Sequence, residues 1–391
     1  MRGMNADDKY IVELAKASIF DKIPANPEEG INWNYIFKKA NEQNIVGLLY
    51  CAVSKLDGKY QPGRELMEKW NKLMLTTMGV MTQKYYEFQR MCRIIADRGI
   101  RLIGLKGCIV RELYPVPELR TMGDFDVLIR REDLGEVTEI FKGEGYRIEN
   151  GIYGVICGNE NVLWEVFPTI EEEFRKKPEE MDEIYFHNCI EDGMISYPKP
   201  TYFLAHLIVH MGKHYVERGA GIRNLCDIAL FVDKYKGDID FQKAKKICID
   251  EGFSNIFNYV VNTIDSWFDI DVSKIETEKK ECGKFLEYSL EYGIFGINNN
   301  SMVVKVARYE DDSIGSIRKI FFPTVKLLDN RYTYLKKWPF LLPIAWVHRI
   351  FYALFTHKYS AKQVIGEIKG ATEFFDRRID WLSELGLMEE H

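Results

Sequence analysis

The sequence predicts an α+β fold, with a small β-sheet core embedded between N-terminal and C-terminal helical regions. Apolar residues recur at helical spacing before about residue 77 and again after residue 200. Between these regions, short apolar runs typical of buried strands alternate with short helical segments. We therefore expect an N-terminal helical region over residues 1–77, an α/β core over residues 78–199 and a C-terminal helical domain over residues 200–391.

The N-terminal region is expected to be helical from about Asp7 to Leu75, with Asn32 or Asn34 capping its second helix. A long helix over residues 78–97 ends near Gly99, because glycine suits the residue that terminates a helix. The core then follows as strand 100–105, helix 108–114, strand 125–129, helix 131–142, the hairpin 146–149 and 153–157, and strand 162–167.

Asp124 and Asp126 at the start of the second expected strand are the first candidate site residues. Residues i and i+2 of a strand share a face, so the two carboxylates project side by side while Phe125 and Val127 point into the core. Two neighbouring carboxylates repel each other and lose hydration when buried. Mg²⁺ prefers oxygen ligands of this kind and often shares them with substrate phosphates.

A third acid, Glu165, lies in the middle of the apolar strand 162–167. If this strand neighbours the one that carries the aspartates, three carboxylates hold one or two metal ions and deprotonate an attacking hydroxyl. Pairing of Glu165 with a buried Arg or Lys is the alternative, because acids are rarely buried without a partner.

Basic residues and a glycine accompany these acids. Lys106 and Arg120 carry the charge to offset phosphate, and Gly107 lets a triphosphate approach the backbone closely. The alternatives are a solvated Lys106 at the strand end and an ion pair between Arg120 and Asp124 or Asp126.

The chain resembles the uncharacterised nucleotidyltransferase family of the polymerase-β-like nucleotidyltransferase superfamily, from about Trp33 to Phe355. The resemblance is carried by Leu102–Gly107, Leu113–Pro115, Arg120 with Gly123–Ile129, Gly145-Tyr146, His206–His210 with His214, Ile222–Ile228 and Leu342–Arg349. It implies a small mixed β-sheet flanked by helices. It also implies transfer of a nucleoside monophosphate from an NTP, with release of pyrophosphate.

By position, the resemblance makes Asp124 and Asp126 metal ligands, Glu165 the third acid and Gly107 the glycine of the phosphate loop. We expect Mg²⁺ or Mn²⁺ as the metal, ATP as the first candidate NTP, and a hydroxyl of a small molecule or protein as the acceptor. The superfamily usually has Gly-Ser or Gly-Gly at the loop, whereas this chain has Gly107-Cys108. Thiols are weak hydrogen-bond donors. A nucleotide-binding or interaction module with little or no turnover is therefore the alternative function.

His206, His210 and His214 share one face of an expected helix. We expect them to be packed or to line the cleft, with His210 and Lys213 beside the nucleotide. A zinc hydrolase site on this helix is a third, weaker hypothesis, since the sequence has no HExxH motif. Arg223 and Asp227, one helical turn apart, are expected to form an ion pair.

The composition of the chain indicates which partners and which cellular compartment to expect. The net charge of −6 disfavours nucleic acid as a partner. The eight scattered cysteines contain no CxxC pair and the first eight residues lack an apolar run, so we expect a cytoplasmic protein. The apolar stretch 338–355 contains two prolines and Arg349, which disfavours a membrane span. It is expected to pack in the core or to contact a protein partner through the C-terminal region.

Overall fold

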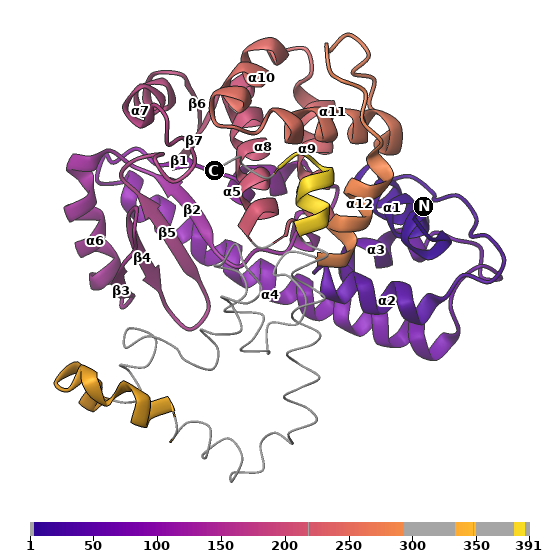
Figure 1. Cartoon of the computed structure of the whole chain (residues 1–391), viewed down its shortest axis with the longest axis horizontal. Coiled ribbons are helices and arrows are strands. Elements are labelled where there is room, and N and C mark those ends of the chain that lie inside the picture. Colours follow the sequence, from indigo (N-terminus) through magenta and orange to yellow (C-terminus); the bar gives the residue numbers. More distant parts are fainter. Residues whose placement is uncertain (1–3, 218, 293–332, 347, 349–378, 388–391) are drawn as a thin grey trace. The chain divides into compact units, whose positions relative to one another are not determined.

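The computed structural model describes residues 4–217, 219–292, 333–346, 348 and 379–387 (Figure 1). By its internal contacts the chain divides into two units, one of Met1–His214 with Ala220–Ile294 and one of Tyr215–Gly219 with Phe295–His391. The first unit has the predicted α+β architecture, a mixed seven-stranded sheet with flanking helices. In the second unit, Leu335 of the short helix η4 (Thr333–Lys336) forms a small buried cluster with Ala345.

Four helices precede the sheet: α1 (Ala6–Ile19), α2 (Trp33–Glu42), α3 (Val46–Val53) and α4 (Arg64–Ala96). The side chain of Asn32 caps α2 by accepting from the backbone N–H of Tyr35, as one of the two predicted caps. Helix α4 has 33 residues, so the long helix expected from residue 78 begins earlier and crosses the predicted region boundary at residue 77.

The core contains the predicted elements in their predicted order. They are β1 (Ile103–Gly104), α5 (Gly107–Val110) with η1 (Arg111–Leu113), β2 (Phe125–Leu128), α6 (Leu134–Gly143), β3 (Arg147–Asn150), β4 (Val155–Gly158) and β5 (Leu163–Phe167). Four further elements lie where the sequence analysis made no prediction: η2 (Pro117–Leu119), α7 (Pro178–His187), β6 (Cys189–Asp192) and β7 (Ile195–Pro198).

The strand order across the sheet is β3-β4-β5-β2-β1-β7-β6. Strand β2 pairs in parallel with β5 and antiparallel with β1, and β7 adds to the other side of β1 in parallel. The β2/β5 ladder places Phe125 opposite Trp164 and Asp126 opposite Glu165. This register decides which side chains share a face of the sheet.

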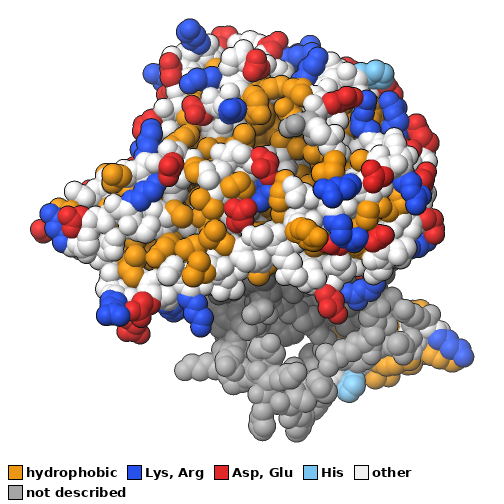
Figure 2. Space-filling model, turned by 180° about the vertical axis from the view of Figure 1, so that it is seen from behind, with side chains coloured by type: hydrophobic (Ala, Val, Ile, Leu, Met, Phe, Trp, Pro, Cys, Tyr) orange, Lys and Arg blue, Asp and Glu red, His pale blue; other side chains and the backbone are white. Residues whose placement is uncertain are grey.

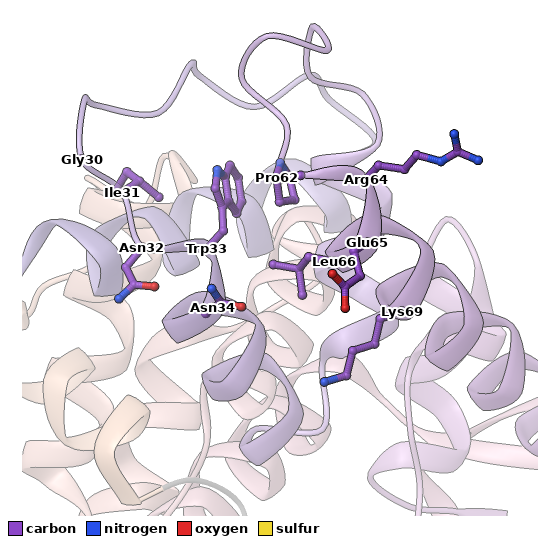
Figure 3. A pocket seen from close by; sticks show the side chains of 11 residues that line it. Gly30, Ile31, Asn32, Trp33, Asn34, Pro62, Arg64, Glu65, Leu66 and Lys69 are labelled. Atoms are coloured by element: carbon purple, nitrogen blue, oxygen red, sulfur yellow. The ribbon is translucent and has the colours of Figure 1, made fainter.

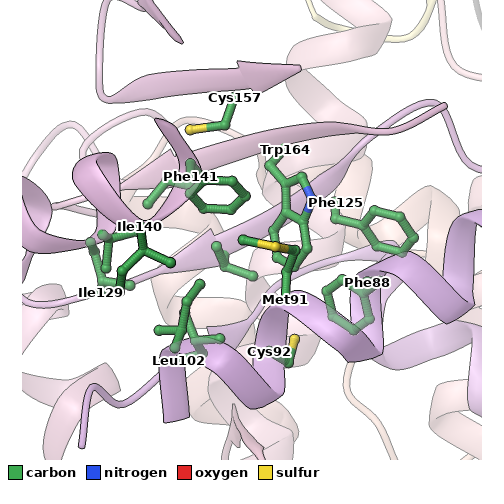
Figure 4. Close-up of a cluster of buried hydrophobic side chains, with 14 of the residues drawn as sticks. Phe88, Met91, Cys92, Leu102, Phe125, Ile129, Ile140, Phe141, Cys157 and Trp164 are labelled. Atoms are coloured by element: carbon green, nitrogen blue, oxygen red, sulfur yellow. The ribbon is translucent and has the colours of Figure 1, made fainter. Parts of the chain in front are cut away.

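One face of the sheet is buried under α4 and α6 (Figure 4). Phe88 of α4 stacks on Phe125 and Trp164, with ring centroids 4.3 and 4.9 Å apart. Val127 and Val166 belong to the same cluster. The prediction that Phe125 and Val127 point into the core is therefore confirmed, and the alternate residues of both strands must face the other side.

In the described residues between 200 and 292, the helices after the sheet are α8 (Pro200–Glu217), α9 (Ile222–Tyr235), α10 (Phe241–Asp250), α11 (Ser254–Phe268) and α12 (Cys282–Tyr292). None of the helices in the described ranges combines the length and apolar character that crossing a membrane requires. Much of the 338–355 stretch lies outside the described residues, and its described part contains the short helix η5 (Pro339–Leu341). All eight cysteines are free.

Candidate active site

The three predicted acids lie together on the face of the sheet opposite the hydrophobic core. Asp126 and Glu165 are directly opposite each other in the parallel β2/β5 ladder, and paired residues of a ladder point to the same face. Asp124 lies two residues before Asp126, immediately ahead of β2. Two carboxylates at the beginning of β2 and one in β5, nearly forty residues later in the chain, are thus brought to one place.

These carboxylates repel one another in a partly buried setting. Burial, with the charges of Asp126 and Asp124, raises the pKa of Glu165 to about 7. Burial and the Asp126 charge also raise the pKa of Asp124. Lys106 acts in the opposite direction on both groups without cancelling the effect. A site with this excess of negative charge would be stabilised by a divalent cation.

The carboxylates of the site are not preassembled around a metal ion. In the described part of the chain, no group of three His, Cys, Asp or Glu side chains is arranged to hold a metal ion. The expected set of three carboxylate ligands is therefore not formed as the side chains stand, and the histidine zinc site gains no support. Mg²⁺ commonly takes only one or two carboxylates and completes its shell with water and substrate phosphates. The chemistry of the Asp124/Asp126 pair fits that requirement.

Lys106 occupies the junction between β1 and α5, with its Nζ 3.1 Å from Asp126 Oδ1 and 3.3 Å from Glu173 Oε1. The alternative of a solvated lysine is wrong, because Lys106 is only 9% exposed. Its backbone is unusual, with φ +47° and ψ −121°. A non-glycine residue in this region is strained, and such strain is frequent at functional sites.

Glu173 was not anticipated from the sequence and is the most enclosed acid of the site, at 2% exposure. Besides Lys106, it contacts His210 Nδ1 at 2.8 Å and Lys213 Nζ at 3.7 Å. Burial alone would raise the pKa of Glu173, but His210 and Lys106 hold it well below its usual range. The sequence shows only the acidic run Glu171-Glu172-Glu173, which is typical of a solvated turn.

The histidines of α8 lie behind this acidic turn, and one of them, His210, contacts Glu173 directly. His210 contacts Glu173 through Nδ1 and His214 through Nε2, at 2.8 and 2.9 Å. His206 is fully buried against Tyr185, and burial lowers the pKa of its imidazole to about 3. Lys213 donates to the carbonyl oxygen of Glu172. His210 and Lys213, which were expected beside the nucleotide, therefore bind the turn that carries Glu173.

Arg120 has a partner that the sequence analysis did not identify. Its Nη2 lies 2.6 Å and its Nε 3.2 Å from the carboxylate of Asp227 on α9, and the Tyr114 hydroxyl donates to the same carboxylate at 2.7 Å. From the sequence, Arg120 is expected to contact phosphate or to pair with Asp124 or Asp126, whereas in the structure its guanidinium pairs with Asp227. The predicted Arg223–Asp227 pair is also wrong, because Arg223 donates to Thr121 instead.

Gly107 and Cys108 support the junction that carries Lys106. A Cβ at Gly107 would collide with Arg120 Nη1 and lie 2.8 Å from Met122 Sδ, so these side chains fill the space that was expected to admit phosphate. The Cys108 thiol donates to the carbonyl oxygen of Asp126 at 3.3 Å. Both residues therefore hold α5 against β2 in this structure.

A separate surface pocket of about 810 Å³ lies between the loop before α2 and the start of α4 (Figure 3). Its lining includes Trp33, Arg64 and Lys69 and none of the three predicted acids. Figure 2 shows one face of the molecule, on which basic and acidic side chains alternate rather than separate. That view offers no broad basic surface of the kind that binds nucleic acid.

The chain was compared with known proteins. No curated protein matches it. Among solved structures, the antibiotic-resistance factor ANT(2'')-Ia is similar over 42% of this chain and 89% of its own, with 14% identity and a TM-score of 0.34. A family model of uncharacterised nucleotidyltransferases matches residues 29–269, which is more than half of the chain and includes α4, the sheet and α9. The chain belongs to the uncharacterised nucleotidyltransferase family.

Proposed function

We propose that the protein transfers a nucleoside monophosphate from an NTP to a hydroxyl group of a small molecule or a protein, with Mg²⁺ or Mn²⁺ as cofactor. ATP is the first NTP to test. The observation that carries the proposal is the β2/β5 register, which places Glu165 beside Asp126 on the face that Asp124 shares. The family match supports nucleotidyl transfer as the class of reaction.

In the proposed reaction, the acceptor oxygen forms a bond to the α-phosphorus of the NTP while the bond from that phosphorus to the bridging oxygen breaks. Pyrophosphate leaves, and Glu165 accepts the proton of the acceptor hydroxyl. A carboxyl with a pKa of about 7 is suited to this task at neutral pH, since a general base works best near its own pKa. Asp124 and Asp126 would hold the divalent ion, which supplies positive charge to the phosphates.

Lys106 contacts Asp126, a proposed metal ligand, so we propose that it also acts on the phosphates. Its ammonium group already bridges Asp126 and Glu173. We propose that five further residues support nucleotide binding indirectly, by fixing the position of β2, α5 and Lys106. Arg120 contacts Asp227, Gly107 packs against Arg120, and Cys108 donates to Asp126. His210 and Lys213 contact the turn that contains Glu172 and Glu173.

A module that binds nucleotide without turnover is the second candidate. It is favoured by one observation, the ion pair in which Lys106 already neutralises Asp126. A lysine in this position competes with a metal ion for the same carboxylate. The two candidates differ in one measurable property, because only the enzyme releases pyrophosphate.

The test combines binding with turnover. Wild-type protein is expected to gain thermal stability when ATP and Mg²⁺ are added together, by about 2.7 kcal/mol at one hundred times the Kd. Asp124→Asn/Asp126→Asn should lose this gain, and Glu165→Gln should keep it while losing pyrophosphate release. Glu171→Gln, an exposed acid on the nearby turn, serves as the control. No binding of any NTP by the wild type would rule out both candidates, and binding without turnover would favour the second.

A further inference from the structure

The loop that leads into β2 is held by two cations from helices on either side of it. Lys84 of α4 donates from Nζ to the carbonyl oxygens of Met122 and Gly123, both at 3.1 Å. Arg223 of α9 donates from Nη1 to the carbonyl oxygen of Thr121 at 2.8 Å and to its hydroxyl oxygen at 2.9 Å. These bonds fix the three residues that immediately precede Asp124.

Arg223 differs from the other arginine of this region in how its donors are used. Arg120 commits both Nε and Nη2 to Asp227. Both of the hydrogen bonds of Arg223 run through Nη1, and its Nε is buried with no hydrogen-bond partner. Leaving a buried charged donor unsatisfied is costly, and such groups are rare in folded proteins unless a ligand completes them.

The surroundings of Arg223 favour an anion. It lies within electrostatic reach of the Asp124 carboxylate. Its own pKa is lowered to about 10, chiefly by burial and by the nearby charge of Arg120, so the guanidinium is still charged at neutral pH. Apart from its two chain neighbours, no residue places a heavy atom within 4 Å of the position that a Cβ would take at Gly123, so the loop is open at the residue that precedes Asp124.

We propose that Arg223 is a phosphate-binding residue that receives the polyphosphate of an NTP held at Asp124 and Asp126. A guanidinium presents several N–H donors in a planar fork that matches phosphate oxygens. The phosphate would satisfy the buried Nε, while Nη1 keeps the group anchored to Thr121. This assignment rests on the proposed function, and it adds to it a residue outside the sheet for recognition of the triphosphate.

The test uses inorganic triphosphate with Mg²⁺ as the probe, measured by calorimetry, because it needs neither a base nor an acceptor. Arg223→Lys keeps the charge but lacks Nε, so we expect its affinity for the probe to fall about ten- to a hundredfold, as for one lost charge-assisted hydrogen bond. The affinity for AMP should change much less. Arg101→Lys is the matched control, since Arg101 pairs with Glu191 at the surface.

Equal affinities of wild type and Arg223→Lys for the probe would overturn the inference while leaving the proposed function intact. If the wild type binds neither the probe nor any NTP, the proposed function fails, and this inference with it. A purely structural Arg223 would lower thermal stability and leave the preference for triphosphate over AMP unchanged. If Arg223→Lys does not fold, a crystal structure of the wild type with Mg²⁺ and a nonhydrolysable NTP decides, by whether a phosphate oxygen lies within about 3.2 Å of the guanidinium.

Discussion

Glu173 shows at the scale of one residue how a buried charge can be retained beside the candidate active site. The carboxylate is almost fully enclosed, yet Lys106 and His210 contact it directly. A buried ion pair adds little net stability compared with apolar packing, but the removal of one partner is costly because the other charge is left unpaired. Glu173 therefore fixes where the Lys106 ammonium lies, and Lys106 in turn contacts Asp126.

The acidic run 171–173 provides a direct test of this role. Glu173→Gln should lower the free energy of unfolding by about 3–5 kcal/mol, since it leaves the buried Lys106 without one of its two carboxylates. Glu171→Gln should change it by less than about 0.5 kcal/mol, because Glu171 is exposed. Denaturant unfolding of both variants measures the difference. Similar values for the two would show that burial of Glu173 carries no energetic weight.

The backbone of Lys106 gives a second prediction. At φ +47° a side chain is strained, so Lys106→Gly should be more stable than Lys106→Ala by about 1 kcal/mol. Both variants lose the ion pairs, which cancel in the comparison. At Lys38, an exposed residue inside α2, the order should reverse by about 1 kcal/mol, because glycine is a poor helix former. If Lys106→Ala were as stable as Lys106→Gly or more stable, the backbone at residue 106 would not be strained.

At the scale of elements, α9 is joined to the sheet through the loop before β2. Arg120 reaches Asp227 of α9 from that loop, and Arg223 of α9 reaches back to Thr121. One contact runs from the loop to α9 and the other from α9 to the loop. Together they constrain both the position and the rotation of α9 relative to the loop. Gly107 is required for this arrangement, because the Arg120 guanidinium packs against it.

A double-mutant cycle tests the Arg120–Asp227 contact. Arg120→Met and Asp227→Leu should each lower the free energy of unfolding by about 3–5 kcal/mol, because each leaves a buried charge unpaired. The double variant should lose clearly less than the sum of the two, since it removes both charges together. Chemical unfolding of the four proteins gives the coupling energy. Strict additivity would mean that the two side chains do not stabilise each other.

At the scale of the whole molecule, the site makes stability depend on pH. The folded-state pKa of Glu165 is about 7, above its ordinary value, so the fold disfavours the charged form. The contribution of Glu165 is thus fully favourable below about pH 4.5 and is lost as the pH rises through 7. Glu173, with a pKa held below its usual range, acts in the opposite direction and loses its contribution as the pH falls.

Comparison of wild type with Glu165→Gln isolates the first of these effects. Without metal, the variant should gain stability relative to wild type between pH 4.5 and pH 7.5. The gain should be on the order of 1–2 kcal/mol once solvent screening of a half-buried group is allowed for. Denaturant unfolding in EDTA at several pH values measures it. A difference that stays constant with pH would show that the carboxyl of Glu165 titrates normally.

Much of the core could be predicted because its signals are local. Phe125 and Val127 alternate with Asp124 and Asp126, and a period of two fixes the faces of a strand without further information. Helix α4 was only partly predicted, since its exposed N-terminal half carries a weaker apolar pattern. Strands β6 and β7 were not predicted, because their sequences, Cys-Ile-Glu-Asp and Ile-Ser-Tyr-Pro, are not apolar runs of the kind that marked β2 and β5.

The sequence by itself determined that two aspartates share one face of a buried strand and that a glutamate lies within another, because these are properties of neighbouring residues. Only the tertiary structure decided that β2 and β5 pair in parallel with Asp126 opposite Glu165. It likewise decided that Arg120 pairs with Asp227 rather than with Asp124 or Asp126 and that Glu173 holds Lys106. The two members of each pair are separated by 39 to 107 residues in the sequence. The chain contains many acids, and tertiary packing decides which of them comes within reach of a given buried cation.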